Sequence, residues 1–228
     1  MKFYITNPEL DKQIAEIRRT IRLSMNGIVS DQMKNNGIIY KQNYGVSIPR
    51  IKEIAKKYVP NHDLAQRLWL LQIRETMIMA TLLEPIDKFT PELAQKWADS
   101  FNHIEIVEQT CMNLFSKLPF ATNLAADWIK SDNKWLQITG YILAARIVAK
   151  FSDSEIIEIV NKAILSSTTE ELHLYKSIAL CLSRFCRKDE NTATYIMKAT
   201  EAFSQNSLTG QLYIYNEVKH EMLFLNDL

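Results

Sequence analysis

Two glutamates one helical turn apart are the side chains best suited to chemistry in this sequence. Glu105 and Glu108 lie three residues apart in an apolar segment that begins at Ile104. Residues i and i+3 are neighbours on a helix, and two like charges in a partly buried site raise the pKa of one of them. Such a pair can stabilise a developing positive charge or position water.

Two other interpretations of the pair stay open. Together with His103 the glutamates could hold a metal ion, although we favour a site without metal and a protein without a cofactor. They could also be ordinary solvated acids. The buried stripe of this helix is predicted to consist of Val107, Cys111, Leu114, Phe115 and Leu118. Glu108 falls beside that stripe, where a residue that lines a groove would lie.

Basic residues are concentrated in the first 60 residues. That part holds 11 Lys and Arg against 5 Asp and Glu, which leaves 16 against 21 in the rest. A basic stripe can bind the phosphates of a nucleic acid, but solvated helix faces also carry such residues. The predicted DNA-binding residues around the turn at Tyr44 are Lys34, Lys41, Arg50, Lys52, Lys56 and Lys57.

Composition favours a helical protein that resides in a reducing compartment. Only 5 Gly and 6 Pro occur in 228 residues, and all-β folds need many more turn residues. The three cysteines form no CxxC pair, which indicates free buried thiols. The N-terminus lacks the apolar region of a signal peptide, and no apolar run is long enough to span a membrane. We therefore expect a cytoplasmic protein without membrane contact.

Helix signals divide the chain into about a dozen helices. Asn7-Pro8-Glu9 and Thr90-Pro91-Glu92 are typical helix starts, and Gly27 is predicted to end the first helix. Capping-box spacing occurs at Ser152–Glu155 and Thr168–Glu171. Glu75 is expected to have a structural role, pairing with Arg74 or a helix terminus. All these residues are read directly from the sequence.

Apolar segments recur along the chain at a roughly constant interval. They begin at Leu68, Ile104, Lys134 and Glu171, and such a period is typical of stacked helix pairs. We therefore predict an all-α fold, an α-solenoid superhelix of HEAT-like antiparallel helix pairs. It would form a single domain over residues 1–228, with basic N-terminal helices over 1–60 and repeats over about 61–228.

Five segments resemble a known family. They read YGVSIPRIKEIAKKY from Tyr44, LWLLQIRETMIMATLLE from Leu68, WADSFNHIEIVEQTCMNLF from Trp97, KWLQITGYILAARI from Lys134 and KSIALCLSRFCRK from Lys176. In order and spacing they resemble the DNA alkylation repair family of AlkC/AlkD-type glycosylases from about residue 30 to about 205. The resemblance implies a HEAT-like superhelix that binds double-stranded DNA and excises N-alkylated purines such as 3-methyladenine or 7-methylguanine.

The resemblance also implies site residues, and the chain departs from the family pattern at three of four positions. The catalytic aspartate of the family falls on Glu108, with Glu105 at the other acidic position of that stretch. The two lesion-contacting tryptophans fall on Ile104 and Leu180, and the phosphate-binding arginine falls on Ile138. Trp135 is the best remaining groove aromatic, and Gln137 lies beside the lost arginine.

Two functions follow from these positions. The first is a repair glycosylase in which Glu108 stabilises the cationic sugar. The second is a non-catalytic HEAT-like scaffold, in which an apolar groove at Ile104, Ile138 and Leu180 binds DNA or a protein partner. A monomer is expected in either case.

Overall fold

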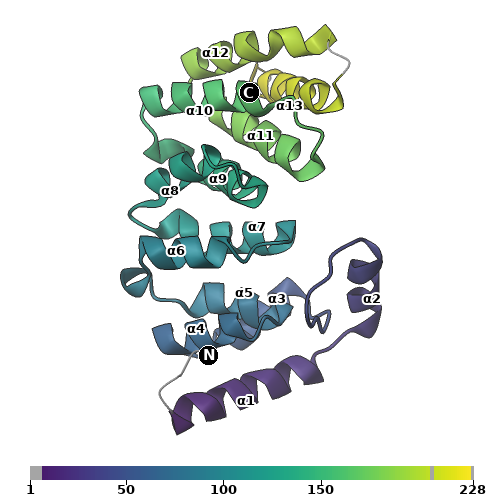
Figure 1. Ribbon diagram of the computed structural model, residues 1–228, viewed down its shortest axis with the longest axis vertical. Helices are drawn as coiled ribbons and strands as arrows, with labels where there is room; N and C mark the ends of the chain where they lie inside the picture. Colours follow the sequence, from purple (N-terminus) through teal and green to yellow (C-terminus); the bar gives the residue numbers. More distant parts are fainter. Residues whose placement is uncertain (1–6, 206–207, 227–228) are drawn as a thin grey trace. The chain divides into compact units, whose positions relative to one another are not determined.

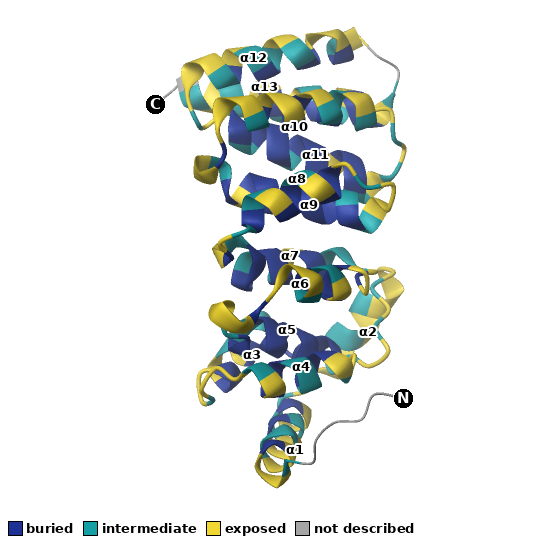
Figure 2. Ribbon diagram, turned by 60° about the vertical axis from the view of Figure 1, so that its left-hand side comes forward, coloured by how far each residue is buried: buried dark blue, intermediate teal, exposed yellow. Residues whose placement is uncertain are grey.

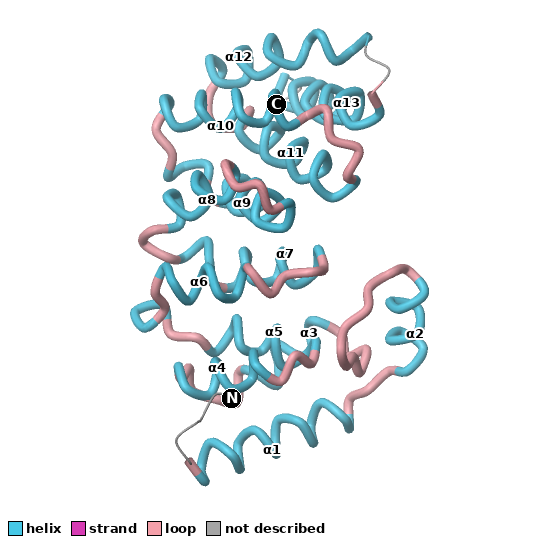
Figure 3. Tube along the Cα trace, in the orientation of Figure 1, coloured by secondary structure: helices cyan, strands magenta, loops and turns pink. Residues whose placement is uncertain are grey.

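The computed structural model describes residues 7–205 and 208–226, and its regular structure there is entirely helical (Figures 1 and 3). The α-helices are α1 Pro8–Leu23, α2 Gly27–Asn35, α3 Ile48–Ala55, α4 His62–Leu70, α5 Arg74–Leu83, α6 Pro91–Ala98, α7 Ile104–Asn113, α8 Ala121–Ile129, α9 Lys134–Arg146, α10 Asp153–Ser166, α11 Leu172–Phe185, α12 Glu190–Thr200 and α13 Thr209–Asn226. Short 3-10 helices lie at η1 Ile86–Lys88, η2 Phe115–Lys117, η3 Val148–Lys150 and η4 Glu201–Gln205. The all-α prediction is confirmed.

The chain falls into two compact units, Met1–Thr90 and Pro91–Leu228. The first contains α1 to α5, and the second contains α6 to α13. The single domain over residues 1–228 that the sequence suggested stays a prediction. Each unit is described here by itself.

The second unit consists of two layers of helices. The second helices of successive pairs, α7, α9, α11 and α13, contact one another in that order, while α8, α10 and α12 do the same on the other side. A short loop joins α6 to α7, α8 to α9 and α10 to α11, which is the HEAT-like arrangement that the repeat spacing predicted. Figure 2 shows many buried residues on α7, α9 and α11, the inner helices of the second unit.

Burial of α9 is nearly complete. Nine of its 13 residues, between Leu136 and Ala145, are buried because α8 packs on one side and α7 and α11 on the others. Gly140 permits the approach of α8, since a Cβ there would lie 2.8 Å from the backbone nitrogen of Ile129. Only the two ends of α9 can therefore present large polar or aromatic side chains.

Three local predictions were wrong. Helix α1 ends at Leu23, and Gly27 instead begins α2, because Asn26 accepts a hydrogen bond from Val29 N and caps that helix. The apolar segment from Leu68 is split between α4 and α5 by Gln72, whose φ is 54°.

The third error concerns the start of α11. Thr168–Glu171 forms no capping box, because the helix begins only at Leu172 and Thr169 Oγ1 accepts from Glu171 N in the preceding turn. The capping box at Ser152–Glu155 is confirmed at the start of α10.

A buried ion pair anchors the segment before α3 in the first unit. The carboxylate of Glu75 is fully buried and accepts hydrogen bonds from the backbone N–H groups of Tyr44 (3.1 Å) and Val46 (3.2 Å). Arg74 Nη1 donates to Glu75 at 3.2 Å and to the Val46 carbonyl at 2.8 Å. The expected pairing of Glu75 with Arg74 is thus confirmed. Gly45 is required between them, because its φ is +67° and a Cβ would meet Asn26 O at 2.1 Å.

Removal of Glu75 should destabilise this unit strongly. Glu75→Ala removes a fully buried carboxylate that binds Arg74 and two backbone N–H groups, and a loss of about 3–5 kcal/mol is expected. Urea unfolding followed by tryptophan fluorescence would measure it. Glu53→Ala, which removes an exposed partner of Arg50, should change stability by less than about 1 kcal/mol. Equal effects for both variants would contradict the anchoring role.

Candidate functional site

Both predicted acids lie on α7. The five residues predicted to form its buried stripe are all buried, since Val107, Cys111 and Phe115 have no exposed surface and Leu114 and Leu118 have at most 1%. The helix ends at Asn113, however, so only Val107 and Cys111 lie on α7, and the other three belong to the turn and 3-10 helix that follow it. Glu108 is exposed and Glu105 is half-buried on the side of the helix next to that stripe. Glu108 therefore lies where α7 meets solvent beside its packed neighbours.

The surroundings of Glu108 raise its pKa above the usual value for a glutamate. The largest cause is partial shielding of its carboxyl group from water, and the charge of Glu105 acts in the same direction. The positive charge of Arg146 and, to a smaller extent, the imidazole group of His173 oppose the shift. Glu108 is thus within electrostatic reach of residues on both α9 and α11, and the three side chains share one face of the second unit.

A stacked pair of rings lies on the same helices. Trp135 on α9 and His173 on α11 have ring centroids 6.1 Å apart and planes inclined by 29°. Both residues are only half-buried, whereas Trp69, Trp97 and Trp128 are core residues with at most 5% exposure. Trp135 is therefore the tryptophan with an accessible ring, which fits the role that its sequence position suggested.

Two arginines occupy equivalent positions at the other end of these helices. Arg146 lies in the last turn of α9 and Arg184 in the last turn of α11. Arg146 follows Trp135 by 11 residues, and Arg184 follows His173 by the same number. At about 100° per residue, side chains 11 residues apart lie on nearly the same face of a helix. Within the described part of the chain, neither arginine forms a hydrogen bond to a carboxylate. The face of α7, α9 and α11 thus combines acids, a ring pair and two available guanidinium groups.

Other predicted residues have local structural partners. Gln137 Nε2 donates to the carbonyl of Ser131 at 2.5 Å and so fixes the loop before α9. Ile138 has no exposed surface, while Ile104 and Leu180 are half-buried. The continuous apolar strip expected from these three residues is therefore interrupted at Ile138, because that side chain packs into the core.

The predicted basic residues all lie in the first unit. Lys34 is on α2, Lys41 precedes the anchored segment, and Arg50, Lys52, Lys56 and Lys57 lie on α3 or at its end. Arg50 donates to Ser24 Oγ at 3.2 Å and pairs with Glu53 at 2.9 Å. The other five are at least partly exposed, and their role as DNA contacts stays a prediction.

Metal and membrane sites find no support in the described residues. Across residues 7–205 and 208–226, no three His, Cys, Asp or Glu side chains gather as metal ligands would. The three cysteines are buried as free thiols, as predicted. None of the helices in those ranges has both the length and the apolar character to cross a membrane.

Sequence reasoning missed His173 and Arg146 as members of this face. The available signal was the constant distance of 38 residues that separates Trp135 from His173 and Arg146 from Arg184. A helical repeat places residues at such a distance side by side on neighbouring helices. The electrostatic link between Glu108 and these residues became visible only with α7, α9 and α11 in place.

The raised pKa of Glu108 predicts a pH-dependent stability difference. Its ionised form is less favourable in the folded protein than in the unfolded chain, so Glu108→Gln should raise Tm at pH 7. The difference should shrink as the pH falls below the raised folded-state pKa, where Glu108 takes up a proton in the folded protein. It should disappear below the lower pKa of the unfolded chain, where Glu108 is protonated in both states. Thermal unfolding from pH 4 to pH 8 would measure it. At each pH, the Tm of the unsubstituted protein is subtracted from that of the variant. A difference at pH 7 that is smaller than the difference at pH 4 would contradict the assignment.

Comparison with known proteins agrees with this architecture. The sequence is similar over residues 17–209 to a protein family described as DNA alkylation repair enzyme. A solved structure also matches, with a TM-score of 0.80 and 14% identity, over 92% of this chain and 94% of that chain. It comes from a new family of proteins related to the HEAT-like repeat DNA glycosylases with affinity for branched DNA structures. No curated protein has detectable sequence similarity. Since the family match spans most of its length, the chain belongs to the DNA alkylation repair enzyme family.

Proposed function

We propose that this protein binds DNA and excises cationic N-alkylated purines, with Glu108 as the catalytic carboxylate. The observation that carries the proposal is the position of Glu108. It lies on an open face of α7, within electrostatic reach of Arg146 and His173. An acid, an accessible ring pair and a cation on one surface supply the groups that such a reaction uses.

The chemistry requires little from the protein. An N3- or N7-alkylated purine carries a positive charge and leaves readily, so the glycosidic bond breaks with its electrons moving to the base. The sugar then carries an oxocarbenium charge, which a nearby carboxylate stabilises before water adds to the anomeric carbon. Ionised Glu108 would act in this way, and Glu105 would keep the site negative.

The Trp135–His173 pair suits the leaving base. A cationic base over the face of a tryptophan is favoured by cation–π attraction, and a neutral purine leaves that surface more easily. Trp135 would therefore supply part of the contact that two tryptophans make elsewhere in the family, at a different position on the helix. Arg146 would hold a neighbouring phosphate.

Base release is the direct test of excision. In methylated duplex DNA, Glu108→Gln should slow release of 3-methyladenine or 7-methylguanine by about 10²–10³-fold, because it removes the charge but keeps the shape. Release is measured by chromatography of the free bases. Glu158→Gln is the control, since Glu158 is an exposed acid on α10 that pairs with Lys130. Release by the unsubstituted protein that equals release by Glu108→Gln would refute the catalytic role.

A second function, structure-selective DNA binding without excision, is favoured by Ile138. This residue replaces the phosphate-binding arginine of the family and is completely buried, so the site lacks that contact. The similar structure comes from proteins with affinity for branched DNA. The acids and rings of the second unit would then contact an unpaired or distorted segment of DNA rather than a reacting sugar.

Salt dependence separates DNA binding from a protein partner. If the protein binds a four-way junction, affinity should fall steeply with salt, with a slope close to the number of neutralised phosphates. Fluorescence anisotropy at several salt concentrations, with a junction and a linear duplex of equal length, would give the salt dependence of affinity for each DNA. Tighter binding of the junction supports the second function. Absent or salt-insensitive binding of both would contradict DNA binding and favour a protein partner.

A further inference from the structure

An open pocket of about 390 Å³ lies on α1 in the first unit. Its lining consists of Ala15, Arg18, Arg19, Arg22 and Leu23. Three of the five side chains are guanidinium groups, and Leu23 is 79% exposed beside them. The pocket therefore combines a strong positive charge with an apolar wall.

Two acids of α1 interact with residues of other elements. Asp11 accepts a hydrogen bond from Arg67 Nη1 at 3.0 Å. Glu16 acts on Tyr58, whose pKa is raised first by burial and then by the charge of that carboxylate. No carboxylate is among the lining residues that the structure describes. Three neighbouring positive charges on one helix favour the binding of an anion.

Arg22 is already held in place, and Arg18 has an unused donor. Arg22 Nε donates to the hydroxyl of Tyr44 at 3.2 Å, and Tyr44 belongs to the segment anchored by Glu75. The Nε atom of Arg18 is buried, and nothing in the described residues accepts its hydrogen bond. A buried donor without a protein acceptor is rare, and an anion that binds beside it can accept its hydrogen bond. Arg18 and Arg22 are four residues apart, so both face the same side of the helix.

We propose that this pocket binds a phosphate group of a nucleic-acid backbone. The guanidinium groups of Arg18 and Arg22 would hold the phosphate oxygens, with Arg19 adding charge at the rim. Ala15 and Leu23 would contact the apolar edge of the attached sugar, which distinguishes a backbone phosphate from free phosphate. The inference rests on the proposed DNA binding, and it adds a contact on α1 that is independent of the face of α7, α9 and α11.

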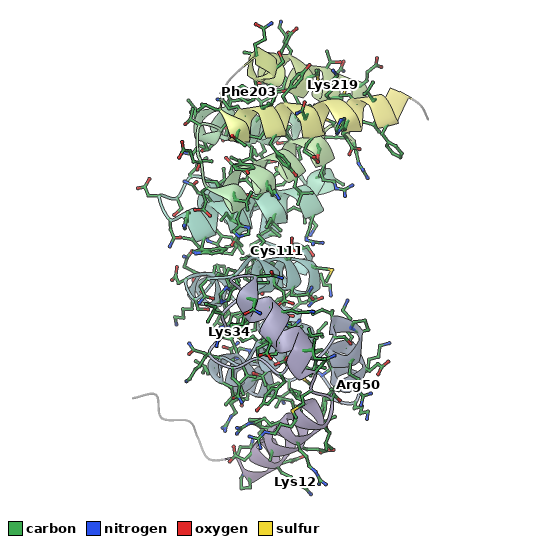
Figure 4. All side chains as sticks on the ribbon, turned by 90° about the vertical axis from the view of Figure 1, so that its right-hand side faces the viewer. Lys12, Lys34, Arg50, Cys111, Phe203 and Lys219 are labelled. Carbon is green, nitrogen blue, oxygen red and sulfur yellow. The ribbon has the colours of Figure 1, made fainter. Side chains whose placement is uncertain are left out.

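The test compares charge-neutral variants on the same helix. Arg18→Gln and Arg22→Gln should each weaken junction or duplex binding several-fold and reduce the salt slope by about one. Lys12→Gln removes one charge from an exposed position of α1 outside the pocket (Figure 4). Its effects on the DNA affinity and on the salt slope should each be less than half of those of the two arginine variants. Thermal unfolding would check that all three variants fold.

A second measurement identifies the source of the phosphate. The Nε–Hε signals of Arg18 and Arg22 are followed by NMR during titration with inorganic phosphate, a single-stranded oligonucleotide or duplex DNA. Larger shifts at lower concentration with the nucleic acids support the proposal. If the protein binds DNA but both variants behave like Lys12→Gln, the pocket is refuted while the proposed function stands. If only inorganic phosphate shifts the signals, the backbone assignment is overturned. Absence of shifts with every ligand also overturns it.

Discussion

Stacking of helix pairs is the constraint on which the second unit depends. A single pair cannot bury its apolar face, so each inner helix must lie between the helices of its neighbours. On α9 this requirement buries all but the ends of the helix. Side chains that can meet a ligand are therefore limited to the first and last turns, where Trp135 and Arg146 lie. The same constraint acts on α11 and places His173 and Arg184 beside them.

The resemblance places an arginine of the family at the position of Ile138, and the same constraint explains how an apolar residue fits there without disturbing the fold. An inner position that carries arginine elsewhere can be filled by an apolar residue, because the surrounding helices exclude water from it. Burial of Ile138 adds to the packing of the core. The cost is the loss of a phosphate contact at that point, and Arg146 provides a guanidinium group further along the same helix.

In the first unit, the Glu75–Arg74 pair has a corresponding organising role. Its carboxylate binds the backbone N–H groups of Tyr44 and Val46, and Tyr44 in turn orients Arg22. A buried charge therefore fixes, through one loop, the direction of an exposed charge on α1. Such positioning matters for binding phosphate, because a guanidinium group that is already oriented loses less freedom when a ligand arrives.

The sequence by itself determined the helical class, the repeat, the burial of the apolar residues in and just after α7, and the structural role of Glu75. These features depend on periodicity and local residue chemistry, which are present in the order of the residues. Only the tertiary structure decided that Ile138 is internal, that Trp135 stacks on His173, and that Arg146 acts on Glu108. The last two relations join residues that lie 38 positions apart in the sequence, and all three depend on how neighbouring helices pack. The helix boundaries at Gly27 and Gln72 were decided by contacts of the loops, which no periodic pattern records.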